Sequence, residues 1–382
     1  MGQEGLVGYP STHLTYLPYP AHLTMLHRFA KLVAAATVIL ILAGSLVTSH
    51  DAGLSVPDWP TSYGWNMFTF PPSMWVANIL YEHGHRLIAS SVGFLTIILA
   101  VWLWLADPRG WLRWFGVAAL VAVIAQGILG GITVLFFLPA AVSTAHAGLA
   151  EIFFCMTVAI ALFTSPRWRA GYEDAPANPS GVDDARLRRM ATAATVLVYS
   201  QILIGATMRH TGAGLAIPDF PWMFGHLVPD HWSPAIAVHF AHRAGALVVT
   251  CAILAASACV WSHHRGRREL TRPAALLPVL VAIQVTLGAL TVLSQRNPWI
   301  NSFHVVCGAL VLTTSLVLTL RSWRVRFADD TVRLKADTTI DPVRTATDSV
   351  RSVRLPTSAP SPLRGAEAGR QPDRDHRSGA RA

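Results

Sequence analysis

The stretch EHGHR, residues 82–86, opens one of several long apolar runs in this chain. Charged and histidine side chains are costly at the mouth of a membrane-spanning helix, so such a cluster is a functional-site hypothesis. A second stretch, HFAHR at residues 239–243, opens another apolar run, and the two His-Arg pairs lie 157 residues apart (242 − 85). Glu82 then falls opposite His239. The chain therefore carries one site twice, with a carboxylate in the first copy and a histidine in the second.

The composition is that of a membrane protein. Of the 382 residues 52% are hydrophobic and only 13% are charged, with a mean hydropathy of +0.42, whereas soluble domains carry about 25% charged residues. The apolar runs are long enough for helices that cross the bilayer.

The net charge of +9 resides in particular loops, which argues against nucleic-acid binding. The four cysteines lie in apolar runs without metal-site spacing, and we expect them to pack as small apolar residues.

The chain is predicted to be an all-α integral membrane protein with eight transmembrane helices, arranged as two pseudo-symmetric four-helix bundles. The predicted spans are 29–48, 82–105, 111–137, 143–163, 190–208, 234–261, 274–293 and 300–320. The predicted domains are a cytoplasmic segment 1–26, a first bundle 27–164, a cytoplasmic linker 165–189, a second bundle 190–325 and a disordered cytoplasmic tail 326–382. The tail is rich in Arg, Asp, Thr, Ser and Pro, which disfavours a packed core.

Two further blocks support the duplication. The loop residues 53–60 align on 214–221 at a spacing of 161 residues (214 − 53), and the block from Gln126 to His146 aligns on the block from Gln284 to His304 at 158 (304 − 146). Because each copy has four spans, both enter the membrane in the same direction. A parallel repeat of this kind predicts a pseudo-two-fold axis along the membrane normal.

Basic residues predict the orientation. The loops at 106–113, 165–189 and 262–272 and the tail are rich in Arg, whereas the loop at 49–80 has no basic residue. The positive-inside rule then predicts that both termini are cytoplasmic in a multi-pass protein of the cell membrane. The loops rich in Pro and Trp, and the sites next to them, face outward.

Each half carries two histidines near the outer ends of different helices: His85 with His146, and His242 with His304. This arrangement is typical of axial ligation of one heme iron by two imidazoles within a helix bundle. A lone histidine is more often a packing residue, and zinc needs three or four N or S ligands. Histidines without an aligned partner are assigned to loops or interfaces; they are His50, His83, His210, His226, His231, His263 and His264.

Three charged side chains accompany the histidines. Arg86 and Arg243 each follow a ligand histidine and either reach the interface as snorkelling cations or hold heme propionates. Glu82 precedes His85 by three residues, so both project from one helix face. It either handles protons at the first site or interacts with the helix dipole. Glu151, five residues after His146, is a second buried-carboxylate candidate.

These residues resemble the heme A synthase family, which serves cytochrome oxidase assembly. The resemblance covers about residues 25–325 and rests on the Glu82-x-x-His85-Arg86 block, the later histidines and the twin Gly-Leu-x-x-Pro-Asp-[Trp/Phe]-Pro loops. One departure is that Val56 stands where many family members have a cysteine, so this loop has no thiol-disulfide role.

The resemblance implies oxidation of a methyl group of heme O to a formyl group, by successive hydroxylation to a geminal diol that loses water, giving heme A. It implies a heme b cofactor on His242 and His304, substrate heme O on His85 and His146, and Glu82 as the critical carboxylate. The implied partners are heme O, the heme O synthase that supplies it, an unidentified electron donor and membrane lipid, without nucleic acid; a homo-oligomer is left open.

Two other functions are considered. A diheme b-type electron carrier or quinone oxidoreductase would explain four histidines but not the single Glu82. A transporter built from repeats predicts broken helices near the midplane of the membrane, whereas the polar groups here gather at the outer ends of the spans.

Overall fold

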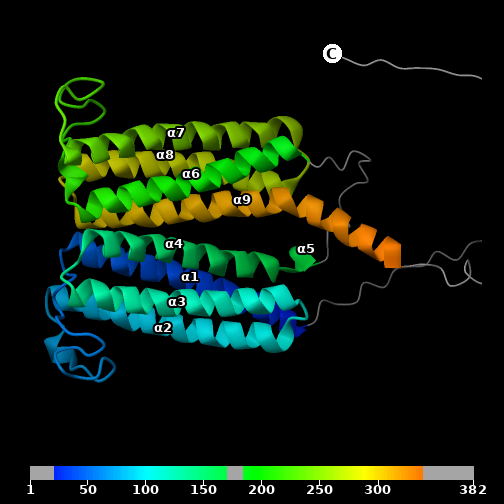
Figure 1. The fold of residues 1–382 in the computed structure, drawn as a ribbon, viewed down its shortest axis with the longest axis horizontal. Coiled ribbons are helices and arrows are strands. Elements are labelled where there is room, and N and C mark those ends of the chain that lie inside the picture. Colours follow the sequence, from blue (N-terminus) through cyan, green and yellow to red (C-terminus); the bar gives the residue numbers. More distant parts are fainter. Residues whose placement is uncertain (1–20, 170–183, 339–382) are drawn as a thin grey trace, which may run out of the picture. The chain divides into compact units, whose positions relative to one another are not determined.

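The computed structural model describes residues 21–169 and 184–338, and within these ranges it contains helices and loops but no β-strand. Two short 3-10 turns lie in the loops, η1 (Pro72–Met74) and η2 (Ala213–Leu215). The α-helices, labelled in Figure 1, are α1 (Ala21–Ser49), α2 (Asn78–Ala106), α3 (Gly110–Leu135), α4 (Ala140–Phe163), α5 (Pro166–Arg169), α6 (Ala185–His210), α7 (Pro234–His263), α8 (Arg268–Leu293) and α9 (Pro298–Thr338).

Within the described ranges, eight helices are long and apolar enough to cross a membrane, and the four-residue α5 is not one of them. The predicted all-α membrane fold and its eight spans are therefore confirmed, with helix ends within a few residues of the predicted positions in most cases. Large apolar side chains such as Phe94, Leu105 and Leu247 are exposed on the helix surfaces. In water, so much exposed apolar surface would be unfavourable. In a membrane, lipid tails cover these side chains.

The first four spanning helices pack as a closed ring. α1 contacts α2 and α4, and α3 contacts the same two helices, as the lower helices of Figure 1 show. Leu26, Leu99, Leu112 and Phe153, one from each helix, share a buried core. The apolar faces of the four helices are thus satisfied by one another.

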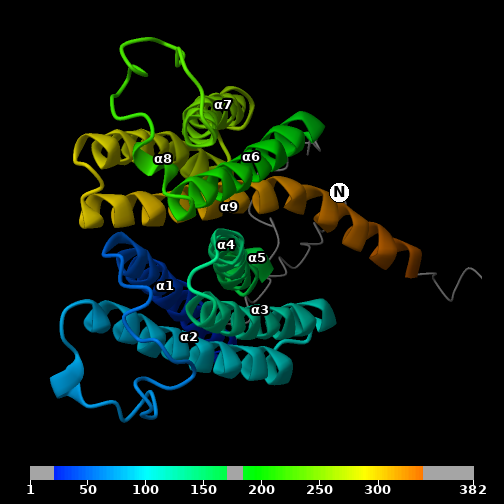
Figure 2. The same ribbon diagram turned by 60° about the vertical axis from the view of Figure 1, so that its left-hand side comes forward.

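The last four spanning helices pack in a similar way. α7 contacts α6 and α8, and Figure 2 shows these helices with α9 from a second direction. α9 joins α6 through a hydrogen bond between the Thr195 and Ser315 hydroxyls (2.8 Å). Ile253, Leu270 and Leu312 belong to the shared core. This packing is consistent with the two predicted four-helix bundles.

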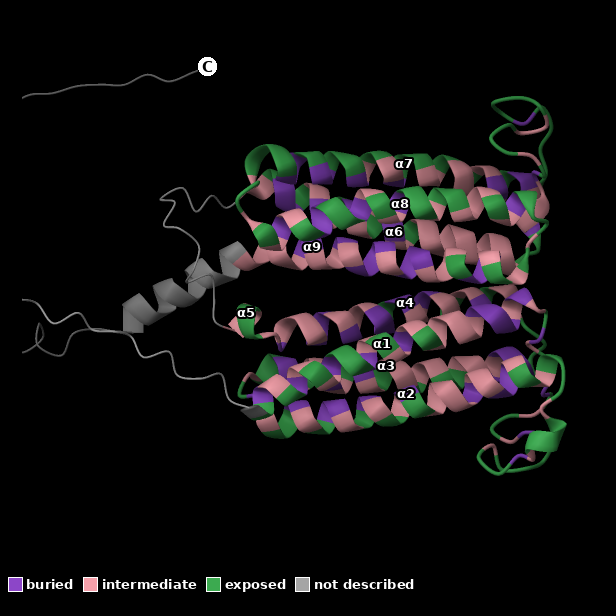
Figure 3. Cartoon of the chain, turned by 180° about the vertical axis from the view of Figure 1, so that it is seen from behind, coloured by how far each residue is buried: buried purple, intermediate pink, exposed green. Residues whose placement is uncertain are grey.

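The two halves meet along α4 and α6, which are in contact. A Cβ at Gly148 would lie 2.7 Å from the Leu203 side chain, so the missing side chain lets α6 approach α4. At the end of the helices that bears the 50–77 and 211–233 loops, here termed the loop end, the Ser49 hydroxyl of α1 bonds that of Ser302 on α9 (3.0 Å). Figure 3 shows buried residues along the facing helix surfaces and exposed residues in these loops.

Only some of the predicted domain boundaries fall within the residues that the structure describes. α1 begins at Ala21, so residues 1–20 of the predicted N-terminal segment lie outside the described residues. In the predicted linker, α5 precedes residues 170–183, which also lie outside, and α6 begins at Ala185. α9 continues to Thr338 and so extends into the predicted tail, while residues 339–382 lie outside the description.

The two loops at the loop end repeat each other in detail. Asp58 accepts a hydrogen bond from the Gly64 N–H (2.9 Å), and Asp219 accepts one from the Gly225 N–H (3.0 Å). Both glycines have positive φ (+78° and +80°), which favours glycine. Burial raises the pKa of both carboxyl groups, but the N–H donors outweigh it and both pKa values lie below the usual value. The duplication therefore extends to the turn chemistry of the loops.

A buried carboxylate at the opposite end joins two turns. Asp107, between α2 and α3, is 0% exposed and accepts hydrogen bonds from the backbone N–H (3.0 Å) and Nε (2.9 Å) of Arg109 and from the Arg169 guanidinium. Arg109 also donates to the Phe163 carbonyl at the end of α4 (3.0 Å). Burial raises the pKa of Asp107, but the bonds and charges of the two arginines outweigh it and hold the pKa below 3.8.

We predict that Asp107→Asn lowers the free energy of unfolding at pH 7 by about 3 kcal/mol, because two guanidinium groups lose their buried counter-charge. Since the folded pKa is depressed, the stabilisation is present above the unfolded value of 3.8 and is lost as the pH falls below it. The difference between variant and wild type should therefore shrink between pH 4 and pH 2. Thermal unfolding in detergent micelles measures this, with the exposed Asp230→Asn as control; equal stability of both proteins at pH 7 would contradict the prediction.

Candidate functional site

The imidazoles of His242 on α7 and His304 on α9 face one another inside the second half. Their ring centroids are 6.4 Å apart and their planes cross at 72°. Two imidazoles bound to opposite sides of one metal ion, with bonds of about 2.0–2.1 Å, have centroids roughly 6–6.5 Å apart, because each centroid lies about 1.1 Å behind its nitrogen. The observed separation therefore fits axial ligation of one heme iron.

Each candidate ligand histidine packs against a glycine of the preceding helix. A Cβ at Gly44 would lie 2.9 Å from its histidine ring and one at Gly205 would lie 2.8 Å away, so a side chain at either position would displace the ring. These two glycines are equivalent in the repeat, 161 residues apart (205 − 44). The four pairs are Gly44–His85, Gly130–His146, Gly205–His242 and Gly288–His304.

The corresponding pair in the first half comes from α2 and α4. His85 and His146 are close enough to interact electrostatically. Within the described ranges, neither Nδ1 atom has a hydrogen-bond partner, although both are buried. The His146 ring approaches the backbone of Gln126 without reaching hydrogen-bond geometry. The ring orientations in the first half are thus less firmly fixed by hydrogen bonds.

The imidazoles of the second half are better fixed. The Gln201 amide nitrogen lies 3.0 Å from Nδ1 of His242, and Nδ1 of His304 donates to the Gln284 carbonyl (3.1 Å). At His304, donation from Nδ1 leaves an unprotonated Nε2 for a metal ion. At His242 the Gln201 amide nitrogen donates to Nδ1, so ligation through Nε2 requires the Gln201 amide to turn and present its oxygen, which has no hydrogen-bond partner among the described residues. At His304 the Gln284 amide lies 3.4 Å from Nε2, a long contact that an iron would replace. Leu40 occupies the position equivalent to Gln201 in the first half (201 − 161).

A zinc-type centre is not what the residues form. Across residues 21–169 and 184–338, no group of three or more His, Cys, Asp or Glu side chains gathers as a metal site. Paired imidazoles are the donor set that a heme iron takes, since the porphyrin supplies the other four ligands.

Glu82 contacts the first loop. It is 3% exposed, and Oε2 accepts a hydrogen bond from the Val56 N–H (2.8 Å). In the second half, Nδ1 of His239 accepts the equivalent bond from the Ile217 N–H (3.2 Å). A neutral imidazole therefore fulfils the same structural role, and what distinguishes Glu82 is its carboxylate group.

Arg86 and Arg243 also bond to the loops. Arg86 donates to Glu82 (2.6 Å) and to three loop carbonyls, and Arg243 donates to the three equivalent carbonyls. These bonds hold the loops against α2 and α7; whether either arginine also holds a heme propionate stays a prediction. The carbonyls belong to Val56, Asp58 and Thr61 for Arg86, and to Ile217, Asp219 and Trp222 for Arg243.

The first loop also covers the first site. The indole of Trp59 lies against Gly131 on α3, where a Cβ would be 2.5 Å from the ring. The preceding residue, Gly130, packs against His146.

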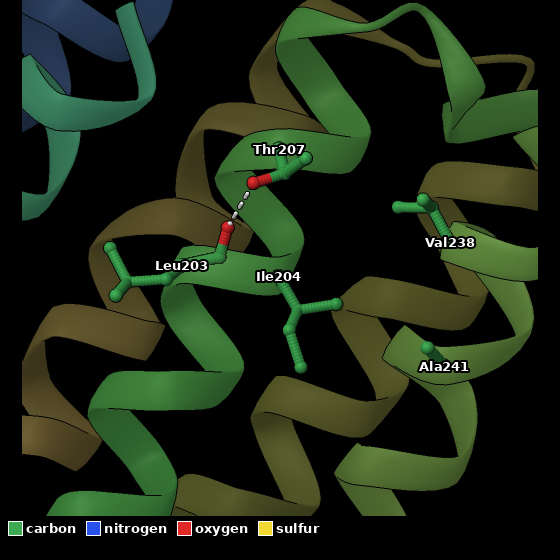
Figure 4. A pocket seen from close by; sticks show the side chains of 5 residues that line it. All are labelled: Leu203, Ile204, Thr207, Val238 and Ala241. Carbon is green, nitrogen blue, oxygen red and sulfur yellow. Dashed lines mark hydrogen bonds between the residues drawn. The ribbon is translucent and has the colours of Figure 1, made fainter. Parts of the chain in front are cut away.

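A pocket of about 290 Å³ lies between α6 and α7 in the second half (Figure 4). The Thr207 hydroxyl in its wall donates to the Leu203 carbonyl (2.9 Å), so the pocket offers mainly apolar contacts; its other lining residues are Ile204, Val238 and Ala241.

Two residues lie in environments that the sequence did not reveal. His83, which we assigned to a loop or interface, is fully buried: its Nδ1 is 3.1 Å from the Ser62 hydroxyl and its ring packs on Phe70 (4.8 Å). His83 is buried, contrary to our assignment, because the first loop folds back over the start of α2. Gly44 was also missed, although its alignment with Gly205 could have identified it.

Glu151, the second carboxylate candidate, lies on α4 and is 4% exposed. In the part of the chain that the structure describes, its Oε2 has no hydrogen-bond partner. It interacts electrostatically with Cys155 and Tyr199, and so lies near the contact between α4 and α6.

Comparison with known proteins gives a consistent result. The family described as "Cytochrome oxidase assembly protein" matches residues 27–316. Among similar proteins, a "Heme A synthase" of Halalkalibacterium halodurans is 28% identical over 75% of this chain and 93% of its own length. Proteins of the same name from Symbiobacterium thermophilum (30% identical; 71% of this chain, 86% of the relative) and Geobacillus kaustophilus (28%; 82% and 98%) are also similar.

We predict that Gly44→Ala weakens heme binding to the first-half histidine pair by about tenfold or more, because the added methyl group displaces the His85 ring. The control is Gly84→Ala on α2, where a Cβ meets no atom within 4 Å and binding should be unchanged. Heme titration followed by absorbance measures both. Equal losses in the two variants, or none in Gly44→Ala, would contradict the packing argument.

Proposed function

The chain belongs to the cytochrome oxidase assembly protein family, and from this premise we propose that it is a heme A synthase. It is an integral membrane enzyme that oxidises one methyl group of heme O to a formyl group, giving heme A. The observation that carries the proposal is the pair of two-histidine sites, one of which has the 6.4 Å ring separation that suits a heme iron. The names of the relatives support the same activity.

The two halves are assigned different hemes. His242 and His304 hold heme b, since their Nδ1 atoms have hydrogen-bond partners and their rings are fixed. His85 and His146 hold substrate heme O, since a site whose Nδ1 atoms lack hydrogen-bond partners among the described residues suits a molecule that must enter and leave. Heme b, when bound, supplies the chemistry of one-electron transfer.

Glu82 is the residue that handles protons at the reacting edge of heme O. It lies on the same face of α2 as His85, and the second half has His239 in its place. Converting a methyl to a formyl group is a four-electron oxidation. Each of the two hydroxylations breaks a C–H bond and takes one oxygen atom from an external oxidant, such as dioxygen with two electrons from the donor, and the resulting geminal diol loses water. Both steps need a group that accepts or donates a proton, as a buried carboxylate does. Arg86 and Arg243 act by positioning the loops beside the two sites.

The protein spans the cell membrane with both termini in the cytoplasm, as the distribution of basic residues favours. The loop end, and with it both heme sites, then faces outward. Its partners are heme O, the heme O synthase that supplies it, an electron donor and the surrounding lipid. The rival function, a diheme electron carrier, has no counterpart among the relatives compared.

We predict that the protein purified from cells that make heme O contains heme b together with heme O or heme A. Extraction followed by chromatography identifies these hemes. Heme A, formed only when this chain is present, is the expected product. Two equivalents of heme b without heme O or heme A would contradict the synthase and favour the electron carrier.

We predict that Glu82→His lowers the rate of conversion of bound heme O by about 100-fold or more, while the protein retains heme b. The variant copies the second half, where His239 makes the same loop bond, so the loop should remain folded. Glu82→Gln tests the charge without changing the side-chain size, and His239→Gln is the matched control that should retain conversion. Full conversion by both Glu82 variants would exclude the proton-handling role.

A further inference from the structure

Arg209, in the last turn of α6, reaches from the second half to the first. Its guanidinium donates to the hydroxyl (3.0 Å) and carbonyl (2.8 Å) of Ser45 and to the Ser49 hydroxyl (2.7 Å) on α1. Its buried Nε has no hydrogen-bond partner among the residues that the structure describes. A charged side chain inside a membrane protein is costly, and a buried donor without a partner adds to that cost. Arg209 is therefore a candidate ligand-binding residue.

The position of Arg209 on α6 places it beside the second-half site. Gly205, against which His242 packs, precedes it by four residues, so both project from one face of the helix. With a rise of 1.5 Å per residue, Arg209 lies about 6 Å closer to the loop end than Gly205. Arg209 also interacts electrostatically with His304. Its cationic group thus lies about one helical turn from the histidine pair.

The charges around Arg209 leave an excess of positive charge. Its charged neighbours include Arg296, in the turn after α8, and Asp51, after α1. Asp51 lies 3.9 Å from Arg296, and its side chain is 87% exposed, so solvent weakens its influence. The guanidinium groups of Arg209 and Arg296 thus share one hydrated carboxylate, that of Asp51. A second anion at Arg209 would bring the local charge closer to neutral.

The first half lacks this cation. Thr48 is the equivalent residue, 161 positions earlier (209 − 48), at the spacing that also relates Gly44 to Gly205. Its hydroxyl donates to the Gly44 carbonyl of its own helix (3.4 Å). The two histidine sites therefore differ at one helix position by a full positive charge.

We propose that Arg209 binds a propionate carboxylate of the porphyrin held between His242 and His304, and that this contact helps to make the second half the permanent heme site. The inference rests on the proposed function, which assigns heme b to that half. A porphyrin of this type carries carboxylates at one edge, and arginine forms strong charge-assisted hydrogen bonds with carboxylates. Arg243 and Arg209 each donate three hydrogen bonds to other groups, but Arg209 also has a buried Nε without a hydrogen-bond partner among the described residues. Neutral Thr48 suits a first-half site that must release its product.

The test compares heme b with its dimethyl ester, in which both carboxylates are neutral. The full chain carries His85→Ala and His146→Ala so that only the second-half site binds, and it is purified from heme-deficient cells. Titration followed by Soret absorbance gives both affinities. The protein should bind heme b about tenfold or more tightly than the ester. Arg209→Gln should lose most of this preference, and Arg209→Lys should keep part of it.

Two controls separate ligand binding from helix packing. The double variant Ser45→Ala/Ser49→Ala removes the side-chain acceptors on α1 but keeps the cation, so it should retain the preference for heme b. Thr48→Ala changes the equivalent position in the first half and should also retain it.

Full preference in Arg209→Gln, or equal loss of preference in the Ser45/Ser49 double variant, would overturn the inference. His304→Ala tests the premise separately, because heme binding that does not depend on His304 would contradict the proposed function and not the carboxylate contact alone. Binding that depends on His304 but ignores esterification would contradict the contact and leave the proposed function intact.

Discussion

The structure depends on the packing of an imidazole against a glycine at four helix pairs. A heme iron between two helices requires both imidazole rings to lie at a fixed separation. Each histidine ring has room because the helix before its own lacks a side chain at one residue, a glycine. Where that room exists, the rings of His242 and His304 are 6.4 Å apart. The loops, their aspartate turns and the arginines that hold them then fix the ends of α2 and α7, from which one histidine of each pair projects.

Duplication explains how one scaffold serves two purposes. Both halves keep the glycine–histidine pairs and the arginine-held loops, and they differ at a few buried positions. The second half has Gln201 and Arg209 where the first has Leu40 and Thr48, so its site gains polar partners and charge. The first half has Glu82 where the second has His239, so its site gains a carboxylate. Under the proposed function, strong retention and chemical reactivity are separated between the two similar bundles.

Much of this architecture follows from the sequence, because apolar length and the spacing of repeated residues are linear properties of the chain. The eight spans and the paired histidines could be predicted from them. Contacts that depend on how loops fold back could not be predicted: His83 is buried under a loop, and Arg86 donates hydrogen bonds to carbonyls of that loop. Arg209 escaped notice because its importance comes from α1, a helix more than 150 residues away in the chain.

The most direct test of the account measures heme content after removal of each histidine pair in turn. Purified His85→Ala/His146→Ala protein should retain about one heme b per chain and produce no heme A. His242→Ala/His304→Ala protein should lose heme b, and with it conversion, while still binding heme O. Loss of heme b from the first variant and its retention in the second would contradict the assignment of cofactor and substrate to the two halves.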